Sequence, residues 1–171
     1  MNNYALVLIL RLLHVVTGIF WVGGVMIVAG FILPSVQALG PAGGPVMNQL
    51  VQVRKLPIRL IIAAWVTVLS GLTLYFRDAH LAGHGWYTST MGRVIGFGGA
   101  LGILVVIIGM LFNVPITRRM QAIGAQIQSG GATPELGAEM QRLQARLIRI
   151  TRIAAVLLVI AASAMAVARY V

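Results

Sequence analysis

Four long apolar runs dominate the sequence and restrict the folds open to the chain. They cover residues 4–33, 58–77, 93–116 and 148–169. About 20 apolar helical residues cross the hydrocarbon core of a bilayer, where only helices and closed barrels satisfy the backbone. Only 9% of the residues are charged, against about a quarter in a soluble domain. We therefore expect an all-α integral membrane protein, a four-transmembrane-helix bundle forming a single membrane domain over residues 1–171.

Basic residues between the apolar runs predict the topology. They gather in two connections, at Arg54, Lys55 and Arg59 and again at Arg118, Arg119, Arg142 and Arg146. Because such residues stay on the cytoplasmic side, both termini and the connection over residues 78–92 should lie outside. The same rule accounts for the formal net charge of +10, so we expect no nucleic-acid partner.

The third connection, residues 117–147, has the features of helix rather than loop. Apolar residues continue at spacings of three and four on both sides of a break at Ser129-Gly130-Gly131. Thr133 and Pro134 are typical of a helix N-cap and first helical residue. The pattern predicts that the third and fourth helices extend into an antiparallel cytoplasmic hairpin. Its arginines would meet anionic lipids or a partner protein.

The first connection is less regular. Pro34 should end the first helix, and a Gly/Pro-rich stretch follows it. Apolar residues then recur among polar ones over residues 46–56. This segment is either a short helix in the membrane interface or a plain loop.

Two ionisable residues lie well inside the first apolar run. Arg11 and His14 are three positions apart and share a helix face, which Gly18 continues one turn further. Ionisable side chains at membrane depth are costly and mark functional sites by default. A neutral imidazole is a good iron ligand, and Arg11 would suit a propionate, so the pair matches a haem b site with Gly18 leaving room for the macrocycle. The alternative is a buried histidine bonded to a neighbouring helix.

The second axial position of such a haem has no evident ligand in the sequence. His80 or His84 would serve if the outer connection folds inward; otherwise the ligand is another side chain, or there is none. The chain has no cysteine, which excludes thiolate ligands and covalent c-type attachment.

Three segments resemble a family of small bacterial membrane proteins. They are LHVVTGIFWVGG over residues 13–24, SGL over residues 70–72, and the entry to the third helix from Gly85-Trp86 to Arg93. The family includes the copper-resistance D type and a membrane-embedded protoporphyrinogen oxidase. The resemblance implies a bacterial inner (cytoplasmic) membrane protein in which His14 is a haem b ligand and Arg93 contacts an anion.

Together these features predict a membrane-embedded b-type haem protein that transfers electrons or oxidises a substrate. A quinone or a porphyrin would be its redox partner, and no catalytic residue is identified. Two other functions remain open: a non-catalytic subunit of a larger membrane complex or homo-oligomer, and a transporter of a small solute or copper. The eight methionines form no cluster of the kind copper(I) prefers.

Overall fold

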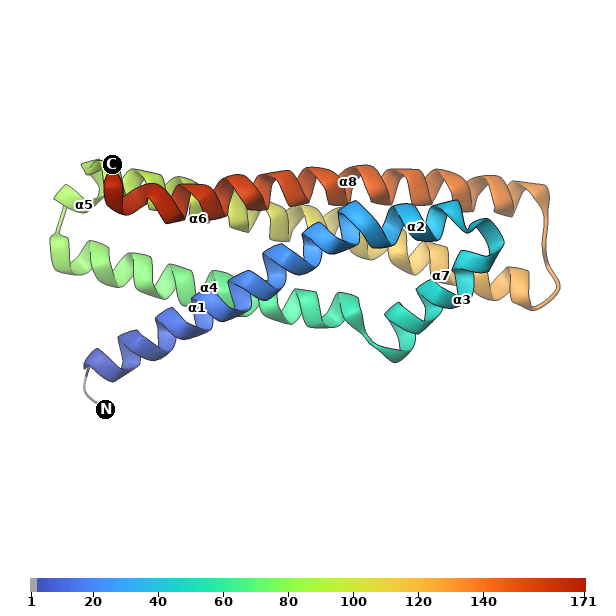
Figure 1. The fold of residues 1–171 in the computed structure, drawn as a ribbon, viewed down its shortest axis with the longest axis horizontal. Coiled ribbons are helices and arrows are strands. Elements are labelled where there is room, and N and C mark those ends of the chain that lie inside the picture. Colours follow the sequence, from blue (N-terminus) through green and yellow to red (C-terminus); the bar gives the residue numbers. More distant parts are fainter. Residues whose placement is uncertain (1–2) are drawn as a thin grey trace. The chain divides into compact units, whose positions relative to one another are not determined.

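A computed structural model describes residues 3–171, which contain helices and connections but no strand. The elements are α1 (Asn3–Ile27), η1 (Val28–Ile32), α2 (Leu33–Ala38), η2 (Gly40–Ala42), α3 (Gly43–Asn48), η3 (Gln49–Val53), α4 (Leu56–Ala82), α5 (Gly85–Thr88), α6 (Thr90–Ile108), η4 (Gly109–Asn113), α7 (Val114–Gln128), α8 (Pro134–Val167) and η5 (Ala168–Tyr170) (Figure 1). The expectation of an all-helical chain is confirmed for these residues.

Four continuous helical stretches are long and apolar enough to cross a membrane. They are Tyr4–Ala38, Leu56–Ala82, Thr90–Gln128 and Pro134–Tyr170, with 35, 27, 39 and 37 residues. Each exceeds the roughly 20 residues that a crossing requires. The prediction of four long apolar helices is therefore confirmed.

Two of these stretches continue through a proline, which corrects the expectation that Pro34 ends the first helix. Proline has no N–H, and its ring clashes with the carbonyl four residues earlier. For Pro34 and Pro115 that carbonyl belongs to a π-helical turn, η1 or η4. In η1 the N–H of Leu33 bonds to the carbonyl of Val28, five residues back. The wider turn accommodates the proline, so the helix continues.

The outer connection is also more helical than expected. A loop was predicted over residues 78–92, but α4 continues to Ala82, α5 covers Gly85–Thr88 and α6 begins at Thr90. His80 therefore lies in the last turn of α4. Gly83 has φ +67°, a left-handed conformation that glycine adopts without the steric cost of a side chain.

The described chain divides into two compact units. The first contains residues 3–24, 57–106 and 156–171. Here small residues bring helices together: the Cβ position of Gly98 on α6 lies 3.0 Å from the Ala161 carbonyl oxygen of α8. On α1, a methyl group at Gly24 would stand 2.5 Å from the Leu60 side chain of α4. Such close approaches are typical of helix packing in membranes.

The second unit contains residues 25–56 and 107–155. Its core joins α2, α7 and α8 through four buried side chains, Leu33, Ile116, Leu147 and Ile148. Partly buried apolar residues pack around them, among them Met47 of α3, Met120 and Leu143. Within the segment 46–56, residues 46–53 are helical, in α3 and η3. Of the two alternatives for this connection, a short helix or a plain loop, the helix is the one observed.

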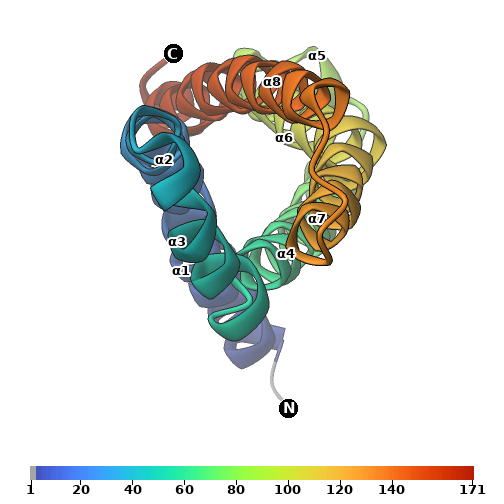
Figure 2. The same ribbon diagram turned by 90° about the vertical axis from the view of Figure 1, so that its right-hand side faces the viewer.

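The connection between α7 and α8 matches the predicted break and cap. It covers residues 129–133, drawn in orange in Figures 1 and 2, and Gly130 has φ +93°. The Thr133 hydroxyl accepts a hydrogen bond from the Leu136 N–H at 3.3 Å, and Pro134 is the first residue of α8. A side-chain cap satisfies one of the free N–H groups at a helix start.

Candidate functional site

The imidazole of His14 is attached to the neighbouring helix by one of its two nitrogens. Its Nδ1 lies 2.8 Å from the backbone carbonyl oxygen of Thr67 on α4. A carbonyl only accepts hydrogen bonds, so Nδ1 carries the proton and, in the neutral ring, Nε2 carries the lone pair. Within residues 3–171, Nε2 has no hydrogen-bond partner. The bond to a neighbouring helix is the alternative to a haem ligand that the sequence left open for His14, and it is the arrangement observed. It occupies Nδ1 and leaves Nε2 available as a metal ligand.

Hydroxyl groups reinforce this contact between α1 and α4. The buried Ser70 hydroxyl donates chiefly to the Val66 carbonyl, at 2.6 Å, and lies 3.1 Å from the carbonyl of the buried Thr67, so its one proton is shared between them. The hydroxyls of Thr17 and Thr67 lie 2.7 Å apart, and each also lies within hydrogen-bond distance of a carbonyl in its own helix. The two hydroxyl protons are shared among three contacts: the one between the two hydroxyls and one from each hydroxyl to a carbonyl of its own helix. Either threonine can therefore donate to the other. The carbonyl that holds His14 is fixed from both helices.

A glycine on α4 makes room for the ring. A Cβ atom at Gly71 would lie 2.6 Å from Cε1 and 2.8 Å from Nδ1 of His14, well inside van der Waals contact. A Cβ atom at Gly18, the residue expected to leave space for a macrocycle, would lie 3.5 Å from the Thr67 methyl of α4, an ordinary van der Waals distance. Gly71 stood out in the sequence only as part of the SGL segment of the resemblance, and no sequence feature pointed to Thr67. The signal available was the small-residue run Ser70-Gly71 inside an apolar helix.

Arg11 and Arg93, the two arginines expected at the site, both have exposed side chains. Neither Arg11 nor Arg93 forms an ion pair with another residue of the described chain. Arg93 lines a shallow hollow of about 290 Å³ along α6, together with Thr90, Val94 and Phe97. Of the other arginines at this end, Arg77 pairs with Asp78 at 2.7 Å.

His80 and His84 do not lie beside His14. The His14 ring contacts α4 at Gly71, and His80 follows nine residues later, about 14 Å along the same helix at 1.5 Å per residue. His84 comes after the end of α4. In this structure neither residue therefore lies near the His14 ring. Residues 3–171 contain no group of three or more His, Cys, Asp or Glu that could hold a metal ion.

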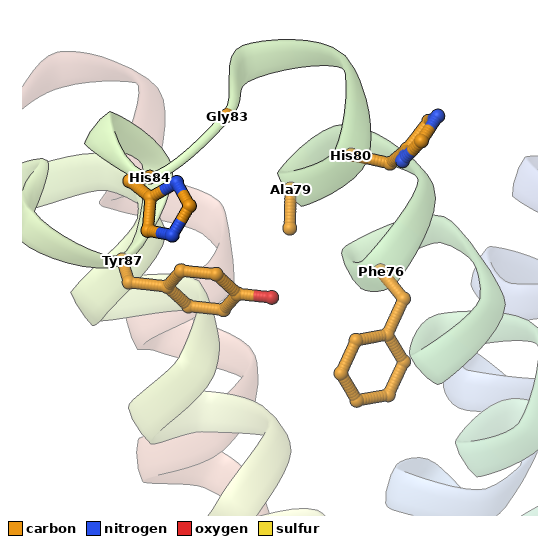
Figure 3. Close-up of a pocket in the computed structure, with 6 residues that line it drawn as sticks. All are labelled: Phe76, Ala79, His80, Gly83, His84 and Tyr87. Carbon is orange, nitrogen blue, oxygen red and sulfur yellow. The ribbon is translucent and has the colours of Figure 1, made fainter.

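His80 and His84 instead line a second cavity of about 450 Å³ where α4 turns into α5. The other lining residues are Phe76, Ala79, Gly83 and Tyr87. In Figure 3 the Phe76 ring approaches from α4 and the Tyr87 ring from α5, while the His80 ring points away from both. Edge-to-face contacts connect Tyr75 with Trp86 and Tyr87, at centroid distances of 5.8 and 6.3 Å.

A bidentate ion pair joins α7 to the first part of α8. The Arg119 guanidinium donates to both carboxylate oxygens of Glu139, at 2.8 and 3.0 Å. These residues lie beyond the segments 93–116 and 148–169 expected in the membrane. The hydrogen bonds from Arg119 lower the pKa of the Glu139 carboxyl. The four arginines of α8 at positions 142, 146, 149 and 152 are all exposed, and Arg146 lies 5.9 Å from the Phe112 ring centroid.

Comparisons of the chain with protein-family models, with curated proteins and with solved structures find no match.

Proposed function

We propose that the chain is a multi-pass protein of a bacterial inner membrane, with a four-helix bundle that carries a b-type haem on His14. The free Nε2 of His14 is the observation on which the haem depends. Histidines that bind metals usually donate their other ring N–H to a carbonyl or carboxylate, which fixes the tautomer and orients the ring. The bond from Nδ1 to the Thr67 carbonyl has this form.

Each nearby residue has a distinct part in the proposal. His14 supplies the axial ligand, and the Thr67 carbonyl and Gly71 hold its ring in place. Arg11, one turn closer to the chain's start, and Arg93 are free to contact carboxylates such as the propionates. A bound haem supplies one-electron chemistry, and the protein supplies its position and electrostatics. His80 and His84 lie away from His14 in this structure, so the proposal assigns no second ligand. The redox partner would be a quinone or a porphyrin.

Orientation and lipid contacts complete the proposal. Both termini lie outside, and the α7–α8 extensions form a cytoplasmic helical hairpin. The positive-inside rule supports this orientation. The exposed arginines of α8 contact anionic lipid headgroups at the inner surface.

Absorption spectroscopy of the purified full chain tests the haem. We expect a Soret band in the oxidised protein and a sharp α-band after reduction. His14→Ala should abolish both bands, whereas the matched control His80→Ala should keep them. A colourless protein purified from haem-replete cells would overturn the proposal, and a non-catalytic subunit or a small-solute transporter would then be the better reading. Full haem content in His14→Ala would refute the ligand assignment.

A further inference from the structure

From the cavity between Phe76 and Tyr87 we infer a binding site for a quinone headgroup. This inference rests on the proposed function only in taking a quinone as the redox partner, and it concerns binding alone. The cavity measures about 450 Å³ and is open on one side: of its lining residues only Ala79 is buried, so it would hold a ring by one face and leave the rest of the ligand outside.

The lining of the cavity suits a flat ring with acceptors at its edge. The Phe76 and Tyr87 rings approach the space from opposite helices, and the buried Ala79 leaves room between them (Figure 3). His84 and Tyr87 are three residues apart on the other side, and neither side chain has a hydrogen-bond partner within residues 3–171. An imidazole N–H and a phenol O–H both donate. Quinone carbonyls accept, and the quinone ring stacks on aromatic side chains.

The place of the cavity along the chain also fits a quinone. Phe76 lies at the end of the apolar run 58–77, and His80 and His84 lie just beyond it. This is the depth at which a helix leaves the hydrocarbon core and aromatic residues are enriched. A quinone has a polar ring and a long apolar tail, so its ring can occupy such a site while its tail stays in lipid.

Other ligand classes fit less well. No arginine or lysine lines the cavity, and the nearby Arg77 is paired with Asp78. A porphyrin carboxylate or a lipid phosphate would therefore lack a cationic partner. A metal ion would need both histidines, but the His80 ring points away from the cavity in Figure 3.

Tryptophan fluorescence offers a direct test because Trp86 contacts Tyr75, which in turn contacts Tyr87. The full chain in lipid nanodiscs is titrated with decylubiquinone, and Trp86→Phe identifies the part of the quenching that belongs to this tryptophan. We expect saturable quenching. Loss of one hydrogen bond in Tyr87→Phe or His84→Gln should raise Kd about three- to tenfold. Thr88→Val, next to Tyr87 but outside the lining of the cavity, is the control and should leave Kd within about twofold of the parent.

Size-exclusion chromatography and circular dichroism of each variant show whether it remains folded, and two independent donor variants guard against the misfolding of one. Quenching that rises linearly and equally in all variants means partition into lipid alone and overturns the inference. Equal weakening by Thr88→Val overturns it too. The haem bands are recorded on the same samples. Saturable quinone binding in a colourless protein would refute the haem and support the quinone site. Haem bands without saturable quenching would support the haem and refute the quinone site.

Discussion

The imidazole of His14 and the backbone of Gly71 lie in direct contact, with 2.6 Å between Cε1 and the place where a side chain at position 71 would begin. The ring is therefore held between the Thr67 carbonyl, which accepts a hydrogen bond from Nδ1, and the backbone of Gly71, which carries no side chain. This contact fixes the ring whether or not a metal is bound. It makes Gly71 as important for the site as His14 itself.

Gly71→Ala should move the His14 ring and weaken the contact between α1 and α4. Forcing one methyl group into a packed contact costs about 1–3 kcal/mol. The free energy of unfolding in a mixed-micelle titration measures the loss, and the Soret band should shift or weaken in parallel. Gly99→Ala is the matched control, because nothing lies within 4 Å of its Cβ position. Equal stability of the two variants would contradict the contact.

The hydroxyl pair of Thr17 and Thr67 should contribute a measurable coupling between α1 and α4. Hydrogen bonds between membrane helices average about 0.6 kcal/mol. A double-mutant cycle with Thr17→Val and Thr67→Val isolates this value from the loss of each hydroxyl alone. Thr73→Val is the control, since its hydroxyl bonds only within its own helix. A coupling energy of zero would mean that the 2.7 Å contact adds nothing.

The hairpin ion pair should respond to acid. The pKa of Glu139 is lowered in the folded state by its bonds from Arg119, so the unfolded chain takes up the proton first as the pH falls. The stabilisation is therefore present above the ordinary glutamate pKa, about 4.3, and is lost as the pH falls through the lowered value. Both side chains are exposed, so the effect is small and screened by salt.

Limited proteolysis of the 129–133 connection between pH 7 and pH 3, with an acid-stable protease, measures this change. Cleavage should accelerate towards the acid end in the parent protein. In Glu139→Gln the rate should be high throughout and nearly independent of pH. A parent protein whose cleavage rate did not change with pH would show that the ion pair does not hold the hairpin together.

Anionic lipid should bind at Arg149 and Arg152, where α8 enters the apolar run 148–169. Each arginine near a negatively charged surface contributes about 1 kcal/mol, so Arg149→Gln with Arg152→Gln should weaken phosphatidylglycerol retention at least about tenfold. Native mass spectrometry of protein released from mixed nanodiscs counts the lipids that remain bound. Arg169→Gln, at the opposite end of the same helix, is the control. An equal loss in that control would place the lipid elsewhere.

Periodicity and composition were sufficient to predict the long helices and the cap at Thr133, because both are local consequences of sequence. Pro34 was misinterpreted, because the π-helical turn that accommodates a proline depends on one backbone hydrogen bond with no sequence marker. His14 was identified from its cost in an apolar run, but its partner, the Thr67 carbonyl, is a backbone atom that could come from any residue. The cavity at His84 depends on where α4 ends, which the expected loop placed several residues too early.

The π-helical turns before Pro34 and Pro115 have a consequence for insertions and deletions. Each turn holds one more residue than an α-helical turn, and an α-helix rotates by about 100° per residue. Removing one residue from η4 would convert the wide turn into an α-helical turn and leave the residues after it, including the buried Ile116 and Ile123, on their present faces. The ring of Pro115 would then clash with the carbonyl four residues earlier, which the wide turn now accommodates. A deletion within α7 itself has no such turn to absorb it, so it would rotate every later residue of that helix by about 100°.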